Sequence, residues 1–299
     1  MGEHGLARMR VLLDWKRDAK HAVLVEAEQS GAYARSGLTV QLVDPAEKSA
    51  DSLEMVFRGS AEAAINYPHN MMCLRDACPG MVSFGALIKN NPQGLLSLQK
   101  AHIDGPRDLP GRKVGIGPSH VSRAQFDMFL QTNAIEEKNV EVLTVGFEGE
   151  ELLLNGEIDA LDAVAYAIPR TRRKGAATSF ISYTASGIPD SPFLVFAARQ
   201  DWLEANLPRV REFLAVTARA VPVVESWGPV QWQDYVRELP GKSAEEEREV
   251  WDATLPLMRG TGPLFWQDIS GLENVASMLL QSGLMKGPCN VSEMFLNLA

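Results

Sequence analysis

The sequence has little cysteine and no long apolar run. Its three cysteines, Cys73, Cys78 and Cys289, show no CxxC spacing, which argues against a disulfide framework and a structural zinc site. Residues 1–10 lack the apolar core of a secretory signal, and no stretch approaches the roughly 18 apolar residues of a membrane span. We therefore expect no membrane span, no metal and a cytoplasmic location, or a periplasmic or extracellular one if a leader has been removed.

Basic residues are also scarce relative to acidic ones. The chain has 29 Lys and Arg against 38 Asp and Glu, a formal net charge of −9, so most of its surface repels a phosphate backbone. The one basic run, Arg170–Lys174, is short and is typical of a solvated helix face or loop. We therefore expect no nucleic-acid partner.

Short motifs that carry known chemistry are missing as well. The sequence contains no GxSxG, HExxH, P-loop or GxGxxG pattern, so it shows no nucleophile elbow, zinc-protease helix or nucleotide-phosphate loop. Sequence spacing alone gives no argument for a catalytic triad.

What the sequence does have is alternation of strand and helix. With 299 residues, 45% of them apolar and 22% charged, it is long enough for one large domain or two lobes. The alternation in the first part of the chain predicts a mainly parallel sheet. Strands are predicted at residues 9–13, 38–43, 63–67 and 81–88, and helices at 21–34, 53–57 and 69–76.

A second lobe is predicted to begin after the turn-rich segment 106–111 and to interrupt the first. Its predicted elements are strands at 113–117, 140–145 and 160–166 and helices at 122–132 and 148–155. An apolar strand at 192–198 would return the chain to the first lobe, and the remaining pattern is helical. We predict that the first lobe contains residues 1–105 and 190–299, and the second 106–189.

Several segments together carry a resemblance to a known family. They are Leu13–Trp15 with His21 six residues later, Glu28–Tyr33, Gly37–Val40, Phe57–Tyr67, Asp104–Gly115, Leu152–Ala160 and Gly187–Pro189. In order and spacing the chain resembles the SsuA/thiamine-pyrimidine-synthase-like family over roughly residues 9 to 220. That family includes ABC-importer substrate-binding proteins for pyrimidines and sulfonates, and eukaryotic enzymes that make the thiamine pyrimidine.

The resemblance implies an α/β, two-lobed, type 2 periplasmic-binding-protein-like fold that closes by hinge bending on one ligand; the helical C-terminal tail adds little to it. In such folds, ligand contacts come from strand carboxyl ends and helix amino termini. In the first lobe these positions hold Trp15 and Tyr67, which could sandwich a flat ligand, with His69 and Asn70 beside them. His21 is predicted either to bond the ligand or to cap local backbone.

The second lobe offers Ser119 and His120 at the start of a helix, where Ser119 is a candidate N-cap and anion site. Asp162 and Tyr166 end a predicted strand, and a carboxylate there could bond an amine or amidine. Lys89–Asn91, after the strand at 81–88, are further candidates for lining the ligand site.

Two departures weigh against the enzymes of the family. In those enzymes a histidine near residues 66–70 is consumed beside a lysine that holds pyridoxal phosphate, and Asn66 stands where the lysine would be. They also carry a cysteine-rich iron-binding run in the second lobe, whereas this chain has no cysteine between Cys78 and Cys289. If the protein were an enzyme, His69 or His21 would be its general base or donor.

The sequence therefore favours a small-molecule-binding protein without a cofactor, of the ABC-importer type. Its predicted ligand is flat and heteroaromatic or amine-bearing, thiamine-pyrimidine-like or sulfonate-like, and an ABC permease is a possible partner. The alternatives are a cytoplasmic enzyme on the same fold, such as a thiamine-pyrimidine precursor synthase, and a ligand sensor that acts through the helical tail.

Overall fold

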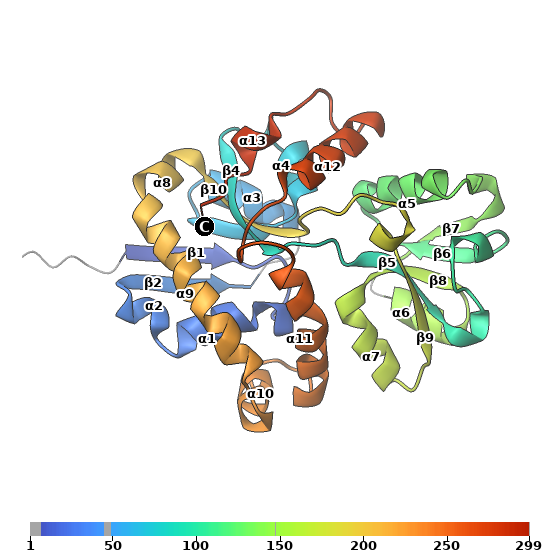
Figure 1. The fold of residues 1–299 in the computed structure, drawn as a ribbon, viewed down its shortest axis with the longest axis horizontal. Helices are drawn as coiled ribbons and strands as arrows, with labels where there is room; N and C mark the ends of the chain where they lie inside the picture. The colour runs from blue at the N-terminus through green and yellow to red at the C-terminus, as the bar shows by residue number, and fades with distance from the viewer. Residues whose placement is uncertain (1–6, 45–48, 147, 299) are drawn as a thin grey trace, which may run out of the picture. The chain divides into compact units, whose positions relative to one another are not determined.

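The computed structural model describes residues 7–44, 49–146 and 148–298. The chain forms two compact units, each built around its own five-stranded sheet (Figure 1). Unit 1 extends to Asn90 and also contains Pro192–Leu272 and the segment from Cys289. Unit 2 contains Asn91–Ser191 and Glu273–Pro288.

The sheet of unit 1 has the strand order β2-β1-β3-β10-β4. Its strands are β1 (Ala7–Leu12), β2 (Leu38–Val43), β3 (Ala63–Asn66), β4 (Met81–Ile88) and β10 (Leu194–Arg199). The first three are parallel, and β10 runs antiparallel to both β3 and β4. Consequently β1, β2, β3 and β4 all end at the same edge of the sheet, where β10 begins.

Helices cover this sheet and include most of the C-terminal part of the chain. They are α1 (Ala22–Gln29), α2 (Ala32–Arg35), α3 (Ser49–Phe57), α4 (Pro68–Cys73), α8 (Gln200–Ala205), α9 (Leu207–Glu225), α10 (Pro229–Val236), α11 (Ala244–Arg259) and α13 (Val291–Met294). The helix predicted at 21–34 is divided because Gly31 takes a left-handed conformation, φ 73°. Beyond it, Tyr33 stacks on Phe213 of α9 and shares a hydrogen bond with Thr217, 2.7 Å.

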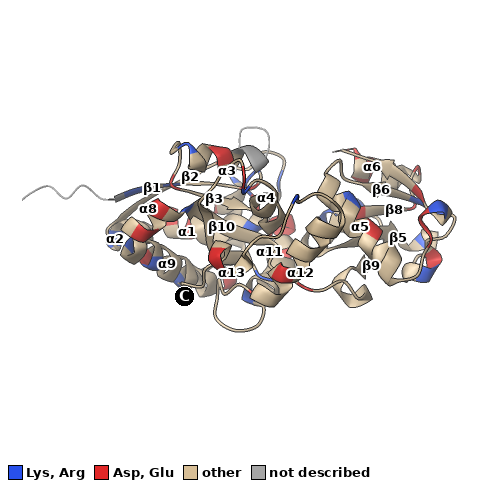
Figure 2. Cartoon of the chain, turned by 90° about the horizontal axis from the view of Figure 1, so that it is seen from above, with Lys and Arg blue, Asp and Glu red and all other residues tan. Residues whose placement is uncertain are grey.

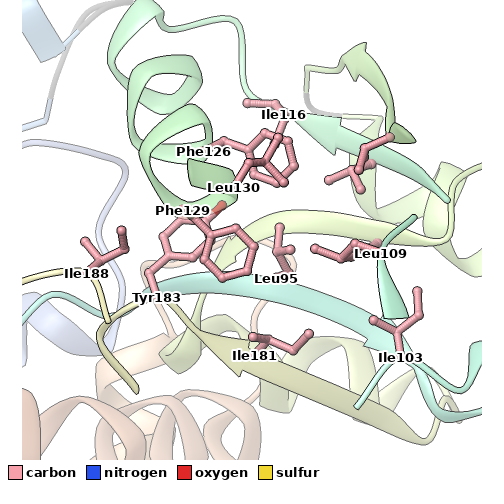
Figure 3. Packing of buried hydrophobic residues seen from close by; sticks show 13 residues of the cluster. Leu95, Ile103, Leu109, Ile116, Phe126, Phe129, Leu130, Ile181, Tyr183 and Ile188 are labelled. Atoms are coloured by element: carbon pink, nitrogen blue, oxygen red, sulfur yellow. The ribbon is translucent and has the colours of Figure 1, made fainter. Parts of the chain in front are cut away.

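The sheet of unit 2 has the order β7-β6-β8-β5-β9. Its strands are β5 (Gln93–Leu98), β6 (Lys113–Ile116), β7 (Glu141–Thr144), β8 (Ala160–Val164) and β9 (Thr178–Ser182). Its helices are α5 (His120–Thr132), α6 (Gly149–Asn155) and α7 (Ile168–Arg173), and α12 (Ile269–Gln281) starts in unit 1 and continues into unit 2. Between α5 and the sheet, Phe126, Phe129 and Tyr183 pack with Leu95 (Figure 3).

The second unit begins earlier in the chain than predicted. Residues 91–105 were assigned to the first lobe, but they contain β5, which pairs antiparallel with β8 and β9 inside the second sheet. Residues 273–288 also lie in unit 2. Both corrections have the same cause. Each segment joins unit 2 through contacts with residues more than 60 positions away along the chain, and local sequence patterns do not reveal such contacts.

Acidic and basic residues are interspersed over both units, as Figure 2 shows. The basic run Arg170–Lys174 lies on and just after α7. Within the described ranges, no helix combines the length and the apolar character that a membrane crossing requires.

Candidate functional site

The carboxyl edge of the unit 1 sheet gathers most of the residues predicted for the first lobe. Parallel pairing of β1 with β3 sets Leu12 beside Ala64, so the loop carrying Trp15 and the turn carrying Tyr67 leave the sheet at one edge. Antiparallel pairing sets Val195 of β10 beside Asn66, which brings Phe193 to the same edge. Ligand contacts cluster at such edges because loops converge there.

Three rings pack together at this edge. Tyr67 stacks on His69 with ring centroids 5.2 Å apart and planes 19° apart, and it meets the ring of Phe193 edge-on at 5.2 Å. Burial lowers the pKa of His69 to about 4, so its imidazole is uncharged at neutral pH. The group therefore offers aromatic surface and a neutral polar ring; Phe193, the last residue before β10, is a member that sequence reasoning missed.

Asn66 stabilises the turn that carries Tyr67 and His69. It is fully buried, and its Nδ2 donates to Ser52 Oγ at 2.9 Å. Its Oδ1 accepts the Tyr67 backbone N–H at 2.7 Å and Nδ2 of Asn70 at 2.9 Å. The side chain of Asn70 is thereby held beside His69, while its contact with a ligand stays a prediction.

The loop between β1 and α1 contains a buried charged group, which we call the loop cluster: Asp14, Asp18, Lys20 and His21, all at most 3% exposed. The Lys20 ammonium lies 3.2 Å from Asp18 Oδ2 and 3.5 Å from Asp14 Oδ2. Burial lowers the pKa of Lys20, but the two carboxylates outweigh it and raise that pKa above its usual value. Trp15, next to the cluster, is 44% exposed.

His21 takes the capping role, one of its two predicted alternatives. The Asp18 backbone N–H donates to His21 Nδ1 at 3.3 Å, which leaves the ring proton on Nε2, 2.8 Å from Asp14 Oδ1. The side chain has no exposed surface, and both ring nitrogens are engaged. The predictions of His21 as a ligand contact or as a general base therefore find no support in this geometry.

Burial and charge pairing shift the pKa of Asp14 in opposite directions. Burial raises the pKa of its carboxyl, but the Lys20 ammonium and the His21 hydrogen bond together bring it below its usual value. Asp14 is therefore ionised at neutral pH. Lys20 was missed at the sequence level, although the dense charge of residues 14–20 directly after an apolar strand was the available signal.

The candidates of the second lobe lie in two places in unit 2. Ser119 is the N-cap of α5, as predicted, with its Oγ accepting the Val121 N–H at 3.1 Å. The neighbouring His120 is exposed and lines a surface hollow of about 360 Å³ with Arg123, Asp127 and Gln281, among others. An anion at this helix start stays a prediction.

Asp162 lies within β8, opposite Leu95, and not at its end. Its Oδ1 accepts the Tyr183 hydroxyl at 3.1 Å, and burial raises its pKa to about 7 despite this bond. Tyr166 is buried in the 3₁₀ turn that follows β8. A bond from Asp162 to a ligand amine stays a prediction.

Lys89, a further candidate, is a structural residue in unit 1. Its ammonium donates to the carbonyl oxygens of Arg259, 2.9 Å, and Pro263, 2.8 Å, and also to those of Thr261 and Gly262. It thus ties the end of β4 to the loop after α11. Among the residues described, no three His, Cys, Asp or Glu side chains come together to hold a metal ion.

Comparison with solved structures defines the class. The fold is that of the type 2 periplasmic binding proteins: the aliphatic sulphonate binding protein SsuA of Escherichia coli superposes with a TM-score of 0.77 at 12% identity, covering 96% of this chain and 97% of that one. Residues 18–224 match the family model described as NMT1/THI5 like. The chain belongs to this family, which confirms the resemblance inferred from its sequence.

Two relatives of this chain are named for different activities. A formylaminopyrimidine-binding protein of Halalkalibacterium halodurans is 23% identical over 304 residues, 98% of this chain and 91% of its own. A 4-amino-5-hydroxymethyl-2-methylpyrimidine phosphate synthase of Legionella pneumophila is 26% identical over 154 residues, 51% of this chain and 48% of its own.

Proposed function

We propose that this protein binds an uncharged, planar aminopyrimidine related to the thiamine pyrimidine and releases it chemically unchanged. The observation that carries the proposal is the ring group at the carboxyl edge of unit 1, where Tyr67 stacks on an uncharged His69. A flat heteroaromatic ring gains stacking energy on such a surface, and neutral polar atoms beside it avoid the cost of desolvating a charge.

The comparisons support the same ligand class. The relative named for formylaminopyrimidine binding aligns over nearly the whole chain, whereas the Legionella synthase aligns over about half of it. An ABC permease as partner belongs to this proposal, because a similar solved structure, SsuA of Methylobacillus flagellatus, is described as the periplasmic sulfonate-binding protein of a sulfonate ABC transporter. Closure of the two units on the ligand, which the resemblance implied, stays a prediction.

The enzyme alternative meets an obstacle at Asn66. The resemblance implies a pyridoxal-phosphate lysine at this position, and the asparagine there has its amide bonded to Ser52, to Asn70 and to backbone. Lys20, which interacts electrostatically with Tyr67, is held between two carboxylates that keep its amine protonated, and a protonated amine cannot form a Schiff base. These residues do not fit the cofactor.

Calorimetric titration of formylaminopyrimidine, 4-amino-5-hydroxymethyl-2-methylpyrimidine phosphate and an alkanesulfonate tests the proposal. We expect the uncharged pyrimidine to bind most tightly. Tyr67→Ala should weaken its binding roughly 10- to 100-fold because the stacking surface is lost, while Tyr67→Phe, which keeps the ring, should stay within about threefold. Equal affinity of the native protein and Tyr67→Ala would contradict this site.

A further inference from the structure

The loop cluster is attached to helices that lie outside the family match. The match ends at residue 224, and α10 and α11 follow it. Glu247 of α11 has no exposed surface, and its Oε2 accepts the backbone N–H of Ala19 at 2.6 Å. Its Oε1 pairs with the Lys242 ammonium at 2.9 Å, so this buried carboxylate is compensated.

A second bond arrives from α10. The Tyr235 hydroxyl donates to the backbone carbonyl oxygen of Asp18 at 2.6 Å, and Tyr235 is itself buried. Two adjacent residues of the loop, Asp18 and Ala19, are therefore held through their backbone by side chains more than 200 residues away. Charge-assisted bonds to backbone amides are among the strongest local restraints on a loop.

From these two anchors the bonding continues to Asp14, the residue that precedes the exposed tryptophan. The Asp18 carboxylate holds Lys20, which pairs with Asp14, and Asp14 also accepts the ring proton of His21. Asp14 directly precedes Trp15. A shift of the Asp18–Ala19 backbone would therefore be transmitted to Trp15 through the loop cluster.

We propose that Glu247 and Tyr235 are positioning residues, through which the C-terminal helices hold Trp15 in the conformation that meets the ligand. This inference rests on the proposed function for its ligand, but its structural part concerns the loop alone. It gives the helical tail a role in preorganising the site, which lowers the ordering cost of binding.

The test labels the protein with 5-fluorotryptophan and assigns the Trp15 ¹⁹F resonance with Trp15→Phe. Glu247→Leu removes the acceptor, Glu247→Gln restores a neutral one, and Tyr235→Phe removes only the hydroxyl. The matched control is Thr254→Val, also fully buried on α11, whose hydroxyl donates to the Val250 carbonyl oxygen of the same helix. We expect the Trp15 resonance to shift or broaden most in Glu247→Leu, less in Glu247→Gln and Tyr235→Phe, and not in Thr254→Val.

Hydrogen exchange and affinity complete the test. The Ala19 amide should exchange at least about tenfold faster in Glu247→Leu than in the native protein, and formylaminopyrimidine should bind about tenfold more weakly. A Trp15 resonance that stays native-like in Glu247→Leu and Tyr235→Phe would overturn the inference. If the native protein does not bind the pyrimidine, the proposed function fails, and the ¹⁹F and exchange results still decide the positioning role.

Discussion

The two units differ in what compensates the charge of a carboxylate that is largely removed from solvent. In unit 1, Asp14 and Asp18 share the Lys20 ammonium, and the pKa of Asp14 lies below its usual value. In unit 2, the hydrogen bond that reaches Asp162 from the described residues is that of the Tyr183 hydroxyl, and burial raises the pKa of Asp162 to about 7. A compensating cation, and not burial alone, decides whether a carboxylate stays ionised.

This difference matters for the proposed function. The loop cluster has fixed charges that are satisfied internally, so it suits a role in holding the loop that carries Trp15. The raised pKa of Asp162, about 7, lies close to neutral pH, so the charge of Asp162 responds to the groups beside it. An amine placed near Asp162 would stabilise the ionised form and lower its pKa.

The largest effect is expected from removing the cation of the loop cluster, which leaves its carboxylates without a compensating charge, as Asp162 is in unit 2. Lys20→Met leaves Asp14 and Asp18 buried without their cation, and we expect the free energy of unfolding to fall by about 3–5 kcal/mol. Chemical denaturation at pH 7 measures this. Lys16→Met, an exposed lysine of the same loop, should change it by less than about 0.5 kcal/mol, and equal small effects of both variants would refute the role given to Lys20.

Replacing Asp162 of unit 2 by asparagine tests the other half of the comparison. Between the unfolded pKa of Asp162, about 4, and its folded pKa of about 7, the unfolded chain loses a proton that the folded protein keeps, so stability falls as pH rises. Asp162→Asn should remove this loss, on the order of 4 kcal/mol between pH 4 and 8, because each unit of pKa difference corresponds to about 1.4 kcal/mol.

Denaturant unfolding of the native protein and of Asp162→Asn at pH 4, 6 and 8 provides the measurement. The variant should gain stability relative to the native protein as pH rises. A difference between the two proteins that is constant across these pH values would show that Asp162 does not titrate in this range.

The smallest effect concerns an exposed polar group of unit 2. Ser119→Ala removes the oxygen that caps α5, and we expect about 1 kcal/mol less stability, with little dependence on pH. Thermal unfolding in low and moderate phosphate also tests the predicted anion site at this helix. Stabilisation by phosphate that disappears in Ser119→Ala would support that site, and its absence in the native protein would remove it.

Much of the fold could be read from local patterns. β2 and β4 have the predicted bounds because β2 alternates buried and exposed residues and β4 is a continuous apolar run. β5 was missed although it lies inside its sheet, between β8 and β9. It contains Gly94, where an added Cβ would lie 2.2 Å from the Ile181 carbonyl oxygen of β9. The close approach of β9 therefore requires a glycine here, although glycine weakens the local strand signal.

The candidate site likewise contains residues that local sequence patterns reveal and residues that they do not. Tyr67, His69 and Asn70 could be predicted because they directly follow a strand, and Ser119 because it precedes a helix. Glu247 and Tyr235 could not, since their partners Ala19 and Asp18 are 228 and 217 residues away. The alternative roles of His21 likewise could be separated only once Asp14 was placed against its ring.

Native mass spectrometry of the protein incubated with formylaminopyrimidine tests the central claim most directly, because it separates binding from chemistry. We predict a one-to-one complex from which the pyrimidine returns with its mass unchanged, and a protein mass that does not change after release. A modified pyrimidine, or a protein that has lost or gained mass, would contradict the binding function and favour an enzyme on this fold.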